Sequence, residues 1–350
     1  MKISRVHIRP VQMTLRRPFV TSAGVQHTRD GWLLFIELGG VVGVGECTPL
    51  AAAGTEDVEH ARRALERAQG LLPNAQVDNV RDVDRVASHV TLEGAPCARF
   101  AVETALLDAL ARLQGVPVAF LLGRSFRRRV ELNAVVAGDV DPAPEIARLR
   151  REGFRAFKLK VGIGSADTRR VFSARDAAGG DAVLRVDANG ACDGATAARM
   201  LGSMEPARLA YCEDPVASSA EAVGLRTQTR VPIAADMWMS AARQHVLGGG
   251  VADVVVLKPA VQGGVLPSMR IAAVAAEHGM DCVVTSTLDG VVARLAALHL
   301  ACALPGDLPA GLATGSHFDG EYAADPAAPV DGGAELPAAS GLGFQEDAFA

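Results

Sequence analysis

The stretch AFKLKVG at residues 156–162 decides the fold, because it places Lys158 and Lys160 two residues apart in a run of apolar, β-prone residues. In a strand, side chains two residues apart point to the same face. The inner face of a half-buried strand is ordinarily apolar, so two ammonium groups on one face need partners of opposite charge. The stretch therefore predicts a strand whose lysines belong to a charged site.

Four further charged residues each stand at the end of a short apolar run: Asp187, Glu213, Asp236 and Lys258. Counted from Lys160, the successive gaps are 27, 26, 23 and 22 residues, the length of one strand-plus-helix unit. Repeated units of this size predict a parallel sheet, and in a closed βα barrel all strand ends meet at one face. One charge after a strand is ordinarily a solvated strand end, but five in succession favour a functional ring.

The same alternation extends over residues 126–315 and predicts an α/β fold, a modified TIM (βα) barrel. The expected strands are 131–136, 156–161, 182–186, 208–212, 232–235, 253–257 and 281–285, with a weak eighth near 310–313. The expected helices are 142–151, 166–178, 195–204, 219–229, 241–247, 264–278 and 291–303. Residues 316–350 are rich in Gly, Pro, Ala and Asp, and we expect this tail to pack back on the first domain.

Residues 1–125 predict a separate α+β domain. Strands are expected over residues 2–13, 32–38 and 41–46, with a tight hairpin at Gly39 and Gly40. Breakers predict a loop over residues 16–24. Helices are expected over residues 56–68, with Thr55 as N-cap, and over residues 97–113.

Composition narrows the class of protein. The 350 residues carry a formal charge of −5 and are 49% hydrophobic, enough for a barrel of ~250 residues and a second domain. The longest basic run is Arg127–Arg129, which argues against a nucleic-acid partner. There is no apolar run of membrane-spanning length and no signal-peptide core, so we expect a cytoplasmic protein without a membrane partner.

Asp187, Glu213 and Asp236 are candidate metal ligands. Three carboxylates at one barrel face repel each other unless a cation lies between them. An all-oxygen donor set suits Mg²⁺ better than Zn²⁺, and Mn²⁺ could substitute. Asn189 and Asp214 lie beside these ligands and could orient them, although ordinary turn chemistry explains both residues almost as well.

The lysines supply the acid–base chemistry. Lys158 and Lys160 come from one strand and Lys258 from another, so on a closed barrel they face each other across the carboxylates. A lysine close to other cations loses its proton more readily and can act as a base. The assembly is therefore suited to removing a proton next to the carboxylate of a small substrate.

These motifs resemble the enolase superfamily, in its mandelate racemase and muconate-lactonizing subgroup. The matching stretches are Lys158–Lys160, Val186–Gly190, Cys212–Pro215, Asp236, Leu257–Pro259, Thr285–Thr287 and, in the first domain, the helix Ala98–Asp108. The resemblance implies a capping domain over the barrel, and Mg²⁺ held by Asp187, Glu213 and Asp236. It also implies Lys160 as the base, Lys158 as its helper that holds the substrate carboxylate, and Lys258 opposite. It further implies that the loop over residues 16–24 serves as a lid.

Within the subgroup the chain looks most like o-succinylbenzoate synthases, in Arg29–Gly31, Gly43–Leu50, Gly54–Glu56, Asn133 and Gly311–Thr314. That resemblance implies a carbon–oxygen lyase that dehydrates a cyclohexadiene carboxylate in menaquinone biosynthesis. Ser286, Thr287 and Asp289 are then expected to lie next to the substrate or the ligands. Two departures are Met237 and Asp289, which stand where the family commonly has Glu.

Other functions stay open at this point. Racemisation or epimerisation of N-acylamino acids or dipeptides needs two opposed lysines, which Lys160 and Lys258 also supply. Dipeptide epimerases tend to carry an Asp-x-Asp element that is missing between Ser286 and Gly315. Muconate cycloisomerisation is a third candidate, and the intact ring argues against a barrel that is only a scaffold. The sequence is compatible with a homo-oligomer. His299 is expected to pack in its helix and not to act as a ligand.

Overall fold

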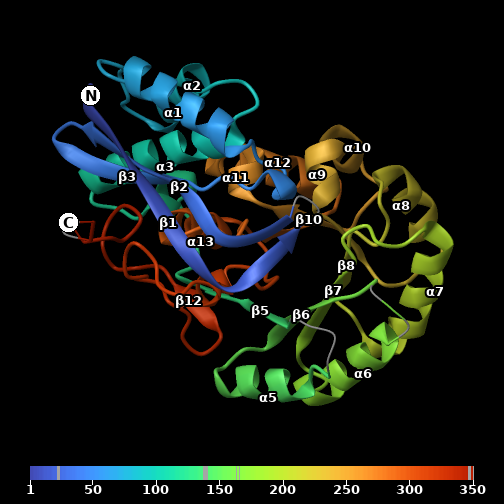
Figure 1. Cartoon of the computed structure of the whole chain (residues 1–350). Helices are drawn as coiled ribbons and strands as arrows, with labels where there is room; N and C mark the ends of the chain where they lie inside the picture. Colours follow the sequence, from blue (N-terminus) through green and yellow to red (C-terminus); the bar gives the residue numbers. More distant parts are fainter. Residues whose placement is uncertain (22–23, 137–140, 163, 165, 346–347, 350) are drawn as a thin grey trace.

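The computed structural model describes residues 1–350 except 22–23, 137–140, 163, 165, 346–347 and 350. Figure 1 shows an N-terminal domain of strands and helices beside a barrel with helices on its outside. The C-terminal segment, red in this view, lies beside the N-terminal strands and ends next to the N-terminal domain. No helix among the described residues is long and apolar enough to span a bilayer.

The N-terminal domain is built on an antiparallel sheet of β1 (Ile3–Thr21), β2 (Gly24–Leu38) and β3 (Val41–Cys47), with β2 in the centre. The predicted hairpin turn is confirmed, because Gly39 and Gly40 have φ of 58° and 85°. The predicted loop is wrong over residues 16–21, which continue β1; the pairing with β2 is interrupted after Thr14 and resumes from Phe19 to Thr21, opposite Gly24. Pro18 is tolerated there because β1 is an edge strand. Residues 22–23 lie outside the described chain.

Four helices follow the sheet in the chain: α1 (Val58–Leu71), α2 (Val80–Val90), α3 (Pro96–Leu113) and α4 (Val118–Leu122). α3 packs on β2 and β3 and α1 on β1, whereas α2 and α4 pack against α3. The predicted N-cap Thr55 is wrong, since the side chain of Asp57 accepts from His60 N at 2.7 Å and begins α1. The helix predicted from residue 97 is confirmed as α3, which is buried on nearly all sides. β3 can approach α3 closely because Gly45 has no side chain. A Cβ at this position would stand 1.9 Å from Ala101 O.

The barrel sheet has seven parallel strands whose spatial order follows their order in the chain. They are β5 (Asn133–Val136), β6 (Ala156–Lys160), β7 (Val183–Asp187), β8 (Tyr211–Glu213), β9 (Ile233–Ala235), β10 (Val254–Leu257) and β11 (Asp281–Val284). The weak eighth strand is reduced to Ala310 and Gly311, which bridge Leu132 on one side and Thr285 on the other. These two residues join the edges of the curled sheet, so the strand ends surround one opening, here called the mouth.

The first predicted barrel strand, residues 131–136, is confirmed over residues 133–136 as β5, whereas Glu131 belongs to a separate strand. β4 (Arg129–Glu131) pairs antiparallel with β12 (Gly333–Glu335) of the tail, and only β5 belongs to the barrel. Pairing with a segment 200 residues away leaves no local signal in the sequence.

Helices cover the outside of the sheet (Figure 1). They are α5 (Ala143–Arg151), α6 (Asp167–Ala178), α7 (Gly194–Met204), α8 (Ser219–Arg226), α9 (Met237–Ala241), α10 (Arg243–Leu247), α11 (Pro259–Gln262), α12 (Val265–Glu277) and α13 (Val291–Ala303). The helix predicted over residues 241–247 is confirmed as α10, which begins two residues later, whereas α9 and the short helix α11 were not predicted.

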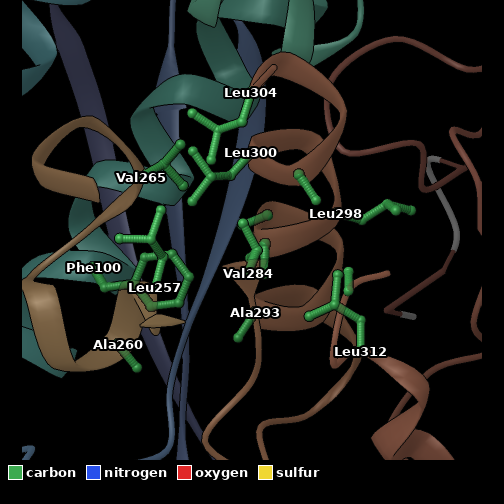
Figure 2. Close-up of a cluster of buried hydrophobic side chains, with 14 of the residues drawn as sticks. Phe100, Leu257, Ala260, Val265, Val284, Ala293, Leu298, Leu300, Leu304 and Leu312 are labelled. Atoms are coloured by element: carbon green, nitrogen blue, oxygen red, sulfur yellow. The ribbon is translucent and has the colours of Figure 1, made fainter. Parts of the chain in front are cut away.

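The two domains share one hydrophobic core. Figure 2 shows Phe100 of α3, Leu257 of β10 and Leu300 of α13, which belong to one cluster of buried side chains. The tail adds to the N-terminal side, where Leu342 N donates to Asp108 Oδ1 at 2.7 Å and the Phe349 ring lies 5.7 Å from that of Phe35. This shared packing sets the N-terminal domain in a defined place relative to the mouth.

Candidate active site

The predicted ring of charged residues comes together at the mouth. Strand pairing places Lys160 beside Asp187, and Asp187 beside Glu213. Asp236 directly follows β9 and Lys258 directly follows β10, at the same end of the sheet. Because the strands are parallel and in register, the regular spacing in the sequence becomes a ring in space.

Both lysines of β6 point to the same face, as their spacing predicts. Lys158 Nζ lies 2.8 Å from Asp187 Oδ2 and 2.8 Å from Glu213 Oε1. Lys160 Nζ lies 2.7 Å from the same Asp187 oxygen. The two amines are therefore the partners that hold the buried carboxylates of β7 and β8 in place.

Lys258 stands on the other side of the carboxylates and forms an ion pair with Asp236. β7, β8 and β9 separate its strand from that of Lys160 (Figure 1). The Lys160 side chain is 44% exposed, against 17% for Lys258 and 19% for Lys158. Of the three amines, Lys160 is the one most open to a molecule in the mouth.

The electrostatics of the ring favour the charged forms of Asp187 and Lys258, whereas burial outweighs the Lys158 ammonium at Glu213 and raises the pKa of that carboxyl to about 8. Burial alone would raise the pKa of Asp187, but Lys158 and Lys160 outweigh it and hold that pKa well below its usual range. Burial alone would lower the pKa of Lys258, but Asp236 and Glu213 outweigh it and raise that pKa. The direction for Lys258 is opposite to the one expected from neighbouring cations, because its nearest neighbours are acids.

The carboxylates of Asp187, Glu213 and Asp236 are each less than a tenth exposed. Buried carboxylates require partners that compensate their charge, and here ammonium groups bind all three. In the described parts of the chain no three His, Cys, Asp or Glu side chains are grouped as a preformed metal cage. The three carboxylates nevertheless fit Mg²⁺, since they are anionic and all their donor atoms are oxygens. The lysine side chains that bind them are flexible and can move aside.

Asn189 and Asp214 both contact the ring. Asn189 N donates to Asp187 Oδ1 at 3.0 Å, and its side-chain oxygen accepts from Lys160. Asp214 accepts from Asp236 N at 3.1 Å and from Met237 N at 2.7 Å. Asp214 thereby orients the backbone of Asp236, whereas Met237 is 48% exposed.

Ser286, Thr287 and Asp289 follow β11 at the mouth, but each is buried and has a partner within the protein. Ser286 Oγ lies 2.8 Å from Thr314 Oγ1. The Asp289 carboxylate accepts from Thr287 N at 2.8 Å and from the Thr287 hydroxyl. In this structure the three side chains stabilise their own loop, and their predicted contact with a substrate stays a prediction.

Val135 was missed by sequence reasoning. It lies on β5 in register with Lys158 and is 39% exposed, although its neighbours on the strand are buried. It therefore presents an apolar side chain to the mouth beside Lys158. Alternation from Asn133 could have indicated this orientation, but only with the strand register known.

Below the ring, the floor of the barrel holds a further cation, Arg185, which sequence reasoning also missed. The buried Arg185 donates to Asn133 Oδ1 at 2.8 Å and to Pro309 O at 2.7 Å, and its guanidinium lies 5.0 Å from the centre of the Tyr211 ring. Asn133, singled out by resemblance, thus supports the floor through Arg185. These bonds tie β5, β7 and the segment that closes the sheet.

Both domains match known families. Residues 3–123 match the family described as mandelate racemase / muconate lactonizing enzyme, N-terminal domain. Residues 142–350 match the family described as enolase C-terminal domain-like.

Three relatives illustrate the range of the match. N-succinyl-L-Arg/Lys racemase from Bacillus cereus is 27% identical over 315 residues, 86% of this chain and 84% of the relative; its crystal structure superposes with a TM-score of 0.89. o-Succinylbenzoate synthase from Thermobifida fusca is 37% identical over 214 residues, 59% of this chain and 66% of the relative. The dipeptide epimerase from Cytophaga hutchinsonii, solved with Mg and the dipeptide D-Ala-L-Val, is 26% identical, with a TM-score of 0.84 and 99% and 97% of the two chains covered.

Proposed function

This chain belongs to the mandelate racemase and muconate lactonizing enzyme family of the enolase superfamily, and from that premise we propose that it removes the proton α to the carboxylate of a small substrate with the help of Mg²⁺. The observation that carries the proposal is the pairing of two amines with acids on opposite sides of the mouth. Lys160 binds Asp187 on one side, and Lys258 binds Asp236 on the other.

Each residue of the ring has a separate part in this chemistry. Asp187, Glu213 and Asp236 would hold the metal, which when bound makes the α-proton more acidic and stabilises the negative charge that develops on the substrate carboxylate. Lys158 lies between two of these acids and supplies a fixed positive charge for the substrate carboxylate. Lys160, the most exposed amine, takes the proton.

We propose dehydration to o-succinylbenzoate as the specific reaction. Lys160 removes the α-proton and then delivers a proton to the β-hydroxyl, which leaves as water, while Lys258 stabilises the charge from the opposite side. Product and water together balance the substrate. Support comes from the 37% identity to o-succinylbenzoate synthase over 214 residues, and from Asn133 and Gly311 at the closure of the barrel.

Racemisation or epimerisation is the second candidate, and the position of Lys258 favours it. An amine on each side of the α-carbon can remove a proton from one face and deliver one to the other. The relatives that are N-succinyl-L-Arg/Lys racemase and dipeptide epimerase share this fold.

The test is an assay in D₂O with Mg²⁺, using the cyclohexadiene precursor, N-succinylamino acids and dipeptides, followed by NMR. Formation of o-succinylbenzoate supports dehydration. Deuterium at the α-carbon without dehydration supports the racemase or epimerase. Turnover that persists in excess chelator, or that Lys160→Ala leaves unchanged, would overturn the proposed chemistry.

A further inference from the structure

The loop Thr285–Gly290, which links β11 to α13, is held in an unusual conformation at the mouth. Leu288 has a φ of 61°, in the left-handed region that side chains other than glycine seldom adopt. Such a conformation costs on the order of 1–3 kcal/mol and persists only where surrounding structure enforces it. Leu288 is also the least buried side chain between Ser286 and Gly290. The direction in which the Leu288 side chain points is thus set by a backbone conformation that the surrounding structure enforces.

The enforcing contacts come from the N-terminal domain and the tail. Glu46 of β3 is 1% exposed and accepts from Gly290 N at 2.6 Å and Ala293 N at 3.0 Å. Tyr322 of the tail donates to Glu46, and its oxygen accepts from Val292 N at 3.1 Å. Together the Glu46 and Tyr322 side chains accept hydrogen bonds from backbone amides at the start of α13. The N-cap residue of this helix, Gly290, provides no side-chain cap for these amides.

Two more observations show how tightly this junction is built. A Cβ on Gly290 would stand 2.7 Å from Tyr322 Cε1 and 2.9 Å from Glu46 Oε1, so any larger residue would force one of these side chains to shift. Arg29 of β2, which is 2% exposed, donates from Nε to Leu288 O at 3.2 Å. Residues from outside the barrel therefore hold the loop by hydrogen bonds at two points, Leu288 O and Gly290 N.

Leu288 in turn packs with an apolar cluster at the mouth. Met13 and Leu15 of β1 and Phe318 of the tail are buried together, and Leu288 and Tyr322 pack against them. Leu15 also bridges Phe318. The loop, the β1–β2 hairpin and the tail thus form one apolar surface beside β11. We call this surface, made by Met13, Leu15, Leu288 and Phe318, the apolar wall.

We infer that Glu46 and Tyr322 are positioning residues for substrate selectivity: by capping α13 from outside the barrel they fix the loop Thr285–Gly290, and with it the apolar wall at Leu288 that contacts the end of the substrate remote from its carboxylate. This inference rests on the proposed function, because it assumes that a carboxylate substrate occupies the ring. It identifies the substrate by chemistry as a carboxylate with an apolar portion reaching from the ring toward β11.

The experiment compares Tyr322→Phe and Glu46→Gln with Glu56→Gln as matched control. Glu56 is also a buried carboxylate of the N-terminal domain, and it accepts from Cys97 N at 2.9 Å and Ala98 N at 2.8 Å at the start of α3. The control therefore loses the same kind of helix-start contact without touching the loop. Tyr322→Phe is the milder of the two test variants and keeps the ring that packs at the wall.

For substrates that the wild type turns over, we expect the first two variants to change the ratio of kcat/KM between short and long apolar portions by about tenfold, mainly through KM. The calorimetric affinity for Mg²⁺ should stay within about twofold of wild type, since the ring is untouched. Amide hydrogen exchange in residues 285–293 should accelerate in these variants and not in Glu56→Gln.

An unchanged selectivity ratio in Tyr322→Phe, or an equal change in Glu56→Gln, overturns the inference. If the wild type turns over none of the compounds, the proposed function fails, and hydrogen exchange decides the inference separately. Equal exchange of residues 285–293 in Tyr322→Phe and wild type then rejects it.

Discussion

Two regions of this molecule bury carboxylates, and they satisfy them differently. At the ring, Asp187, Glu213 and Asp236 are bound by lysine side chains from neighbouring strands. At the start of α13, Glu46 is bound by two backbone amides and by the hydroxyls of Thr48 and Tyr322. We call this second region the α13 junction, and we include in it Arg294 with its partners Glu321 and Asp325.

The difference teaches what each region is for. Lysine side chains are flexible, so the acids of the ring can exchange an ammonium for another cation without unfolding a strand. Backbone amides and a buried phenol are fixed, so Glu46 holds two segments together and cannot readily change partner. A variant at the ring should therefore affect chemistry more than stability, and a variant at the α13 junction the reverse.

Lys160→Ala gives the largest expected effect and tests the first half of this comparison. We expect turnover to fall by about 10³-fold or more, because a general base is lost. Stability should change little, since Lys160 is 44% exposed and Asp187 keeps its bond to Lys158. Steady-state kinetics and urea unfolding measure both quantities. A large loss of stability with retained turnover would reverse the assignment.

Arg294→Met tests the second half. The Arg294 side chain is 5% exposed and lies 2.7 Å from Glu321 and 2.9 Å from Asp325, so its loss leaves two acids without a cation. We expect about 3–4 kcal/mol of destabilisation in urea unfolding. Calorimetric Mg²⁺ affinity should not change, because the ring is separate. A loss below about 1 kcal/mol would show that the junction is held mainly by other contacts.

The pH dependence of the free energy of unfolding tests another buried contact of α13, the one made by His299. His299 Nδ1 accepts from Ala119 N at 3.0 Å, and Nε2 faces Leu342 O at 3.4 Å, an arrangement that suits the neutral ring. Burial lowers the pKa of His299 to about 4, from 6.5. Below pH 6.5 the unfolded chain binds a proton that the folded chain does not bind until about pH 4. The contribution of His299 to the free energy of unfolding is therefore fully present above pH 6.5 and is lost as the pH falls toward 4.

The loss attributable to His299 should reach about 3 kcal/mol at pH 4. The measurement is the free energy of unfolding at several pH values for the wild type and for His299→Phe. The difference between the two curves isolates the histidine. Parallel curves would mean that the His299 ring titrates alike in both states.

Gly290→Ala gives the smallest effect and asks how rigid the α13 junction is. Its φ of −75° is ordinary, so the only obstacle to a methyl group is contact with Tyr322 and Glu46. We expect about 2 kcal/mol of destabilisation. The control is Gly202→Ala in α7, where a Cβ meets nothing within 4 Å and where alanine should stabilise by about 0.5–1 kcal/mol. Equal effects in both variants would show a junction loose enough to adapt.

Much of the ring could be predicted because its signal is local. Lys158 and Lys160 share a face by strand geometry alone, and Asp187, Glu213 and Asp236 each end an apolar run at nearly constant spacing. Parallel pairing in chain order then brings them together without further information. The three carboxylates by themselves also indicated Mg²⁺, and the family resemblance added the separate roles of Lys158, Lys160 and Lys258.

The errors fall where distant segments pair. The loop expected at residues 16–21 is strand because β2 and the Phe318 segment support it, and β4 separates from β5 because the tail pairs with it. The contact of Asp289 with a substrate stays a prediction, and in this structure its carboxylate binds Thr287 in its own loop. In each case the deciding partner lies far along the chain or depends on a turn that composition does not specify.

By itself the sequence determined the barrel, the order of its strands and the charged ring, because periodic spacing and parallel register need only neighbouring units. Tertiary structure alone decided what surrounds that ring: the bond from Glu46 to the start of α13, the place of Tyr322, and the left-handed turn at Leu288. These contacts join residues 244 and 276 positions apart, and their energies come from burial and fixed geometry that exist only once the two domains and the tail have packed.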